Sequence, residues 1–240
     1  MKNVFFIVGP TATGKSEIAA DVARALDAEV VNADAFQIYR GLEILSAKPT
    51  ATILAKAPHH LIGTVSIHEE MNAEKFRRAA SRAISEIRAR GNVALVVGGS
   101  GLYVKALTHG LTANWKEVEA NPKGIFVLRE RDELYARINQ RVETMFEAGV
   151  IEEVRASGAM SSTASKMMGL REIRELIAGK MSILQCVAQI QQNTRNYAKR
   201  QLTWFRHQTS FEALNLSLLT HGEAVKWISQ RAQRAVSAKG

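Results

Sequence analysis

The sequence lacks the features that mark secreted and membrane proteins. Its 240 residues contain a single cysteine, Cys186, so no disulfide framework can form within the chain, and this fits a reducing compartment. The apolar stretch around it, residues 183–190, favours a buried thiol over a reactive one. No apolar run approaches the ~20 residues of a membrane span, and the run at residues 4–8 is too short for a signal peptide. We therefore expect a cytoplasmic protein without a membrane segment.

Internal repeats and low-complexity tracts are also absent, and the composition is that of an ordinary globular protein. The charge is unbalanced, with 32 Lys and Arg against 23 Asp and Glu, a net charge of +9. Such a balance suits an anionic partner such as nucleic acid or a phosphorylated substrate. A basic surface that serves only solubility explains the charge equally well.

Apolar runs and helical patterns alternate along the first half of the chain. Strands are expected at residues 4–8, 29–32, 92–97, 125–128 and 211–216, and helices at 15–26, 72–90, 131–148, 169–178, 182–208 and 222–235. This order predicts an α/β fold of the P-loop NTPase type, with a mostly parallel sheet flanked by helices and a helical C-terminal part. We expect a core at residues 1–111, a short connection at 112–124, a helical remainder at 125–216, and a final helix and tail at 217–240.

A phosphate-binding loop is predicted directly after the first strand. Its residues match the pattern G-x-x-x-x-G-K-[ST] and are Gly9, Pro10, Thr11, Ala12, Thr13, Gly14, Lys15 and Ser16. The glycines let successive backbone N–H groups point at one anion, and the start of the following helix adds partial positive charge. Lys15 supplies a full charge, and Ser16 offers a hydroxyl to Mg²⁺. The motif does not identify the diphosphate.

Two further loops should meet this one, because ligands of open α/β sheets bind outside the carboxyl ends of the strands. They are residues 33–39, which contain Asp34 and Gln37, and residues 98–101, which contain Ser100. Asp34 is interpreted as a magnesium ligand, a general base or a loop cap. Gln37 either reads a substrate or is a solvated polar residue, and Ser100 either binds substrate or tightens its turn.

Nucleotide triphosphatases commonly place an aspartate directly after an apolar strand to organise magnesium and water. Here the strand at residues 92–97 ends instead in Gly98 and Gly99, and no Asn-Lys-x-Asp motif for guanine occurs. These absences argue against a GTPase and against a motor-type ATPase.

The helix predicted at residues 182–208 is basic. Its cationic side chains include Arg195, Lys199, Arg200 and Arg206. Arg195, Lys199 and Arg206 share one face, roughly opposite Tyr197, Gln201 and Trp204. We expect the aromatic face to pack on the core and the cationic ridge to meet nucleic-acid phosphates, to close over the diphosphate, or simply to be solvated.

Taken together, these segments resemble the tRNA dimethylallyltransferase (tRNA isopentenyltransferase) family. The matching segments run in order over about residues 4–206 and are residues 9–16, 32–41, 47–50, 58–62, 97–103, 168–173 and 194–206, with Arg137, Ile138 and Arg141. The resemblance implies transfer of a dimethylallyl group from dimethylallyl diphosphate to the exocyclic amine of the tRNA adenosine 3′-adjacent to the anticodon.

The resemblance also implies roles for single residues. Asp34 would act as the base, while Lys15, a Mg²⁺ ion on Ser16, and Arg141 would stabilise the leaving diphosphate. The adenosine would be flipped out against Asp34, Ala35, Phe36, Gln37 and Ser100. Arg195, Lys199 and Arg200 would contact the anticodon stem-loop, and the enzyme is expected to be a monomer.

The chain departs from the family pattern at three places. Ala35 and Phe36 replace a usual Ser-Met pair, Ser100 replaces a threonine, and most of a helical insertion expected after Tyr103 is missing. An adenylate prenyltransferase that acts on a free nucleotide is therefore an alternative, although the charge and the segment at residues 194–206 argue against it. A small-molecule P-loop kinase and a non-catalytic RNA-binding remnant are weaker alternatives.

Overall fold

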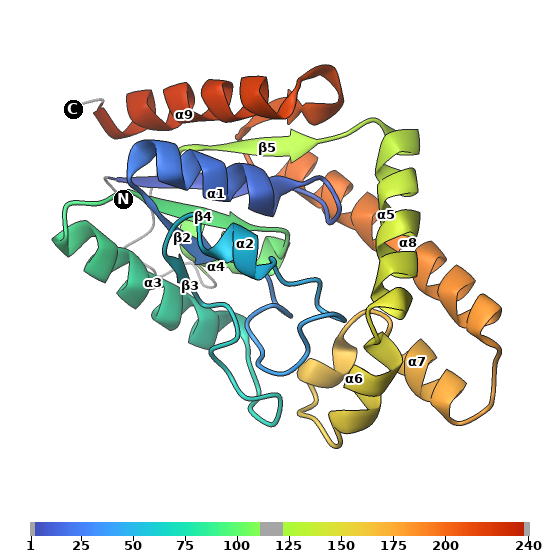
Figure 1. Cartoon of the computed structure of the whole chain (residues 1–240). Helices are drawn as coiled ribbons and strands as arrows, with labels where there is room; N and C mark the ends of the chain where they lie inside the picture. Colours follow the sequence, from blue (N-terminus) through green and yellow to red (C-terminus); the bar gives the residue numbers. More distant parts are fainter. Residues whose placement is uncertain (1–2, 111–121, 238–240) are drawn as a thin grey trace.

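A computed structural model describes residues 3–110 and 122–237, and its centre is one six-stranded sheet (Figure 1). The spatial order of the strands is β3 (His59–His60), β2 (Glu29–Asn32), β4 (Ala94–Gly98), β1 (Val4–Val8), β5 (Gly124–Leu128) and β6 (Glu212–Asn215). Every pairing between these strands is parallel. The mostly parallel sheet predicted from the sequence is confirmed.

Helices cover both faces of the sheet, which explains why β1 and β4 are continuous apolar runs without alternation. On one face, Phe5 and Ile7 of β1 pack with α1 (Lys15–Leu26) and α9 (His221–Ser237). On the other, Phe6 and Val8 belong to a core that includes α3 (Ala73–Ala89), α4 (Gly101–Thr108) and part of α8 (Ile183–Gln208).

The second half of the chain adds a helical region beside the carboxyl edge of the sheet (Figure 1). It consists of α5 (Arg131–Glu147), α6 (Val150–Ala156), η1 (Ala164–Lys166) and α7 (Leu170–Ile177), with α8 running from this region back to the sheet. Two short elements, α2 (Ala51–Leu54) and η2 (Leu216–Leu218), complete the described structure. Within the described ranges, no helix combines the length and apolar composition needed to cross a membrane.

Most predicted elements lie where the sequence placed them. The bounds of α1 agree, and α3 begins after Asn72, whose side chain accepts a hydrogen bond from Lys75 N. The strand predicted at residues 92–97 corresponds to β4, which begins two residues later, at Ala94. The elements β3, α2, α4 and α6 were not predicted. Cys186 is fully buried, as expected.

The division of the chain expected from the sequence stays a prediction. The short connection expected at residues 112–124 falls mainly on residues 111–121, which lie outside the described residues. The sheet itself combines strands from before and after this segment, because β1 pairs with β5.

Candidate active site

The phosphate loop is held in shape by two glycines and by its own hydrogen bonds. A Cβ atom at Gly9 would lie 2.2 Å from the backbone oxygen of Val127, so no side chain fits there. Gly14, at φ 89°, is the left-handed residue that starts α1. Thr13 Oγ1 donates to Pro10 O at 3.0 Å, and Lys15 Nζ donates to the same oxygen at 3.2 Å. The loop therefore forms a compact cradle at the start of a helix, as the motif predicts.

Three arginines from the β5–α5 region surround this loop. Arg129 Nε donates to Thr13 O at 2.8 Å, Arg137 Nε to Ala12 O at 2.8 Å, and Arg141 NH1 to Thr11 Oγ1 at 2.9 Å. Arg137 and Arg141 lie one turn apart on α5, so both reach the same side of the helix. These contacts add positive charge around the loop, where an anion would bind.

Gln201 of α8 ties the phosphate loop to the chain that follows β4. Its Oε1 accepts from Thr11 N at 2.9 Å, and its Nε2 donates to Gly99 O at 2.9 Å. The side chain is buried, with 6% of its surface exposed. The residue therefore pairs two backbone groups from the two loops that were predicted to meet.

The pKa of Lys15 is set by its burial and by the charges of Asp34 and Arg141. Burial lowers the pKa of Lys15 to about 8, although the nearby Asp34 carboxylate raises it and the Arg141 guanidinium lowers it further. Burial also lowers the pKa of Arg141, with a further lowering from Arg137 and an opposing effect of Asp34. An anion bound here would favour the charged form of Lys15, because opposite charge nearby stabilises it.

Asp34 follows β2 and has two kinds of contact. Its Oδ1 accepts from the backbone N atoms of Phe36 at 3.0 Å and Gln37 at 3.3 Å, which is the loop-cap role. The same side chain also lines both cavities of the site. The loop-cap interpretation is thus observed, and it is compatible with a chemical role.

Gln37 and Ser100 make structural contacts within the protein. Gln37 Nε2 donates to Ala47 O at 3.0 Å, which places its amide against the next loop. Ser100 Oγ accepts from Ala35 N at 2.8 Å, so it holds the loop after β2. Their predicted contacts with a substrate stay predictions.

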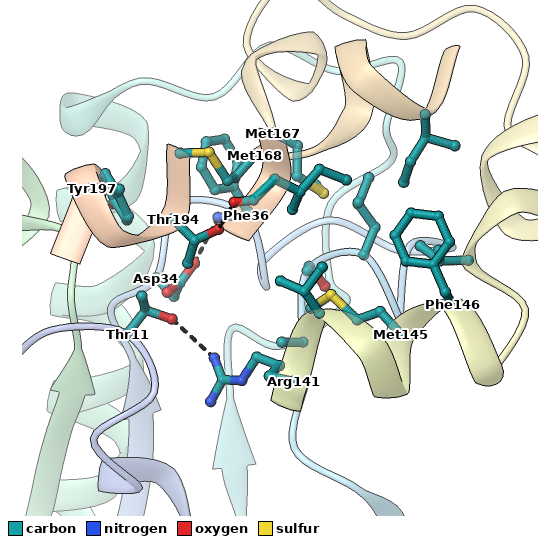
Figure 2. A pocket seen from close by; sticks show the side chains of 17 residues that line it. Thr11, Asp34, Phe36, Arg141, Met145, Phe146, Met167, Met168, Thr194 and Tyr197 are labelled. Carbon is teal, nitrogen blue, oxygen red and sulfur yellow. Dashed lines mark hydrogen bonds between the residues drawn. The ribbon is translucent and has the colours of Figure 1, made fainter. Parts of the chain in front are cut away.

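A mainly apolar recess of ≈ 80 Å³ lies beside Asp34 (Figure 2). One end is polar, where Thr11, Asp34 and Arg141 lie, and Phe146 lies at the opposite side of the view. The rest of the lining is mainly apolar and comes from four parts of the chain: Phe36, Leu45, Val142, Met145, Val150, Met167, Met168, Ile173 and Ile190. The recess can hold a small branched hydrocarbon next to the phosphate loop.

A wide cleft of ≈ 1070 Å³ adjoins the recess and shares Thr11, Asp34 and Arg141 with it. The cleft is also lined by Lys15, Ser16, Arg137 and residues 43, 44 and 46–51. Asp34 therefore stands where the phosphate loop, the recess and the cleft meet.

The basic side chains of α8 divide into two sets. Arg195 is partly buried against α5: its NH1 donates to Asn139 Oδ1 at 2.7 Å. Lys199 and Arg200 are exposed and line a shallow surface groove with Trp204 and His207. The cationic ridge predicted from the sequence is thus outward-facing at Lys199, whereas Arg195 packs between helices.

Sequence reasoning missed several residues of this site. Arg129 and Gln201 reach the loop from 116 and 190 residues away. Tyr197 was expected only to pack, yet it lines the recess, and burial together with Asp34 raises the pKa of its hydroxyl to about 12. Arg129 directly follows a strand, so it could have been predicted by the same rule as Asp34, that ligands bind at the carboxyl ends of the strands. Gln201 lies within a helix, where that rule does not apply.

The sequence is similar to one family of known proteins. A family model described as IPP transferase matches residues 37–124 and 114–208. The chain is 38% identical over 223 residues to a tRNA dimethylallyltransferase from Oenococcus oeni, with 86% of each chain covered. It is 34% identical over 270 residues to tRNA dimethylallyltransferase 1 from Citrifermentans bemidjiense, with 84% of this chain and 88% of the relative covered.

A solved structure extends the similarity to the fold. The full-length tRNA isopentenylpyrophosphate transferase from Bacillus halodurans superposes with a TM-score of 0.87 at 26% identity, and the match covers 98% of both chains. The whole described architecture, sheet and helical region together, therefore has a counterpart in that protein.

Proposed function

Because the chain belongs to the IPP transferase family, we propose that it transfers a dimethylallyl group from dimethylallyl diphosphate to a tRNA adenosine. The acceptor is the exocyclic amine of the adenosine on the 3′ side of the anticodon, and diphosphate is released. The observation that carries the proposal is the position of Asp34, where an anion-binding loop, an apolar recess and an open cleft meet.

The donor has a charged diphosphate and an apolar five-carbon chain, and each would bind in an environment of matching polarity. The diphosphate would occupy the loop of residues 9–16, where Lys15 and Arg141 lie. The five-carbon chain would enter the recess, which is lined mainly by methionine, leucine, isoleucine and valine side chains. In this arrangement the reactive carbon would lie beside Asp34.

Transfer requires a base, because the lone pair of an adenine amine is delocalised into the ring. The amine nitrogen would form a bond to the allylic carbon while that carbon's bond to the diphosphate oxygen breaks. Asp34 would accept the amine proton, with its Oδ1 kept in place by Phe36 N and Gln37 N. Lys15, Arg141 and the loop N–H groups would stabilise the charge that develops on the leaving diphosphate.

The residues at the loop also fit a magnesium ion. The Ser16 hydroxyl and the Asp34 carboxylate both line the cleft, and Mg²⁺ prefers such oxygen ligands together with substrate phosphates and water. Ser16 would hold the ion, which when bound neutralises part of the diphosphate charge.

The tRNA would lie along the exposed face of α8. Lys199 and Arg200 would contact phosphates, and they line one groove with Trp204 and His207. Arg195, by contrast, is engaged with Asn139, so we assign it to the positioning of α8 on α5. The monomeric state and the cytoplasmic location expected from the sequence stay predictions.

The decisive experiment compares Asp34→Asn with the wild type in transfer of labelled dimethylallyl, with Mg²⁺, to unmodified tRNA and to AMP. Asparagine keeps the Oδ1 that accepts the two backbone N–H groups, but it cannot take a proton. We expect label in wild-type tRNA, no label in AMP, and a loss of ~10²–10⁴-fold in kcat for the variant. Asp27→Asn, at the exposed C-terminal end of α1, is the matched control.

Each alternative has its own outcome in this experiment. Label in AMP alone would assign the protein to the free-nucleotide prenyltransferases, and label in neither acceptor would reject the proposal. Full activity of Asp34→Asn would reject the base role while leaving the transfer reaction in place.

A further inference from the structure

The turn of residues 42–48 lines both the recess and the cleft, and we propose that Glu153 is the positioning residue that holds it. The inference rests on the proposed function, because the two cavities are those assigned to the donor and its surroundings. Leu45 lines the recess and Ile44 lines the cleft. Ser46 and Ala47 line both cavities, so this turn forms part of the wall of each.

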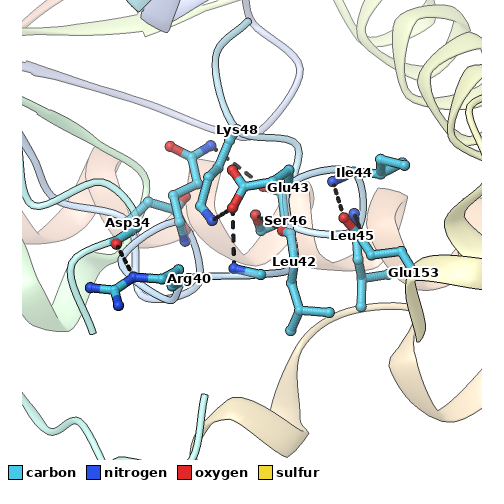
Figure 3. Close-up of polar contacts among 12 residues, drawn as sticks. Asp34, Arg40, Leu42, Glu43, Ile44, Leu45, Ser46, Lys48 and Glu153 are labelled. Atoms are coloured by element: carbon cyan, nitrogen blue, oxygen red, sulfur yellow. Dashed lines mark hydrogen bonds and ion pairs between the residues drawn. The ribbon is translucent and has the colours of Figure 1, made fainter. Parts of the chain in front are cut away.

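Glu153 binds this wall from a different part of the chain. Its Oε1 accepts from Ile44 N at 2.9 Å, and its Oε2 accepts from Leu45 N at 2.8 Å (Figure 3). Glu153 belongs to α6, three residues after Val150, which itself lines the recess. One carboxylate thus fixes the wall to the helix on the other side of the recess.

The internal structure of the turn explains why a carboxylate is needed there. The turn is helical in character, since Ser46 N donates to Leu42 O at 3.2 Å and Lys48 N donates to Glu43 O at 3.1 Å. The first N–H groups of a helical turn have no partner within it, and they attract negative charge. Ile44 N and Leu45 N are two such groups, and Glu153 satisfies both.

Other contacts anchor the turn but do not replace Glu153. Leu42 is fully buried, and Lys48 Nζ pairs with Glu43 Oε1 at 2.7 Å within the turn. Gln37 Nε2 holds Ala47 O at the far end. Loss of the Glu153 carboxylate would therefore leave the turn folded while its first half moves, and the shape of the donor site depends on that half.

The test is Glu153→Gln, with Glu152→Gln as the matched control. Both changes remove one negative charge from the same helix, but Glu152 is exposed and pairs only with Arg155 among the described residues, at 3.9 Å. The glutamine at 153 retains one acceptor oxygen and places an NH₂ group against the other backbone N–H. We expect kcat/KM for the donor to fall roughly 10- to 100-fold in Glu153→Gln, with KM for tRNA unchanged and Glu152→Gln equal to wild type.

Hydrogen exchange of the Ile44 and Leu45 amides gives a readout that does not depend on activity. In the wild type both amides should be protected, and in Glu153→Gln they should exchange at least ~10-fold faster than in Glu152→Gln. Equal exchange in the two variants, or equal donor kinetics, would overturn the proposal. If Glu153→Gln does not fold, the wild type alone still tests the proposal, because unprotected Ile44 and Leu45 amides would refute it. An inactive wild type with protected amides would refute only the proposed function.

Discussion

Gln201→Leu tests how strongly the contact between α8 and the phosphate loop stabilises the protein. Leucine has nearly the volume of glutamine but leaves Thr11 N and Gly99 O without the partners that Gln201 provides. Gly99 is buried, whereas Thr11 is only partly buried, so the penalty of about 1–3 kcal/mol for an orphaned buried group applies to Gly99 O. For a chain of this length about 1 kcal/mol corresponds to ~2–4 °C in Tm, and we expect Tm to fall by roughly 2–12 °C.

Thermal unfolding followed by circular dichroism measures this shift. The matched control is Gln189→Leu, at an exposed position on the same helix. Among the residues that the structure describes, its amide bonds only within the helix, to Asn193 Oδ1 at 3.1 Å. That change should alter stability by no more than ~0.5 kcal/mol. A Tm for Gln201→Leu that equals the control would refute the reasoning, because it would mean that the two backbone groups find other partners.

Two further predictions concern the donor. Since the pKa of Lys15 is lowered to about 8, its positive charge is present below that pH and is lost above it. The kcat/KM for dimethylallyl diphosphate at saturating tRNA should therefore fall as pH rises through about 8. A profile that stays flat across that range would contradict this prediction. The recess of ≈ 80 Å³ is smaller than the ~150 Å³ cavity that admits benzene, so the wild type should reject the ten-carbon geranyl diphosphate, whereas Phe146→Ala should accept it. Rejection by both proteins, with dimethylallyl transfer intact, would mean that Phe146 does not limit the recess.

The parts of the fold that the sequence predicted are those with strong local signals. The bounds of α1 follow from the phosphate-loop motif and an apolar face, and β1 and β4 follow from their uninterrupted apolar runs. The strand β3 was missed because two histidines carry no strand pattern, and it exists through its pairing with β2.

The start of α4 shows a different limit. Gly101 was interpreted as part of a break after β4, yet it is the first residue of the helix. A Cβ atom there would lie 2.5 Å from the ring of Trp204, so the residue must be small because of a tertiary neighbour. A local pattern does not contain that neighbour.

The residues of the candidate site also divide into those that a local sequence signal predicts and those that depend on distant partners. The phosphate loop and Asp34 were predicted, since a motif and the sheet-edge rule locate them. Glu153 and Gln201 were not, because their roles depend on partners 109 and 190 residues distant. The recess was also missed: Met145 and Ile190 belong to apolar stripes that predict a packed core, and a sequence pattern does not reveal where packing leaves a void.

The double use of Asp34 has an evolutionary consequence. Its Oδ1 shapes the loop after β2 by accepting from Phe36 N and Gln37 N, independently of any reaction. Selection for a stable loop would therefore preserve an aspartate or asparagine here in a descendant that had lost catalysis. The presence of Asp34 alone therefore does not distinguish active members of the lineage from inactive ones.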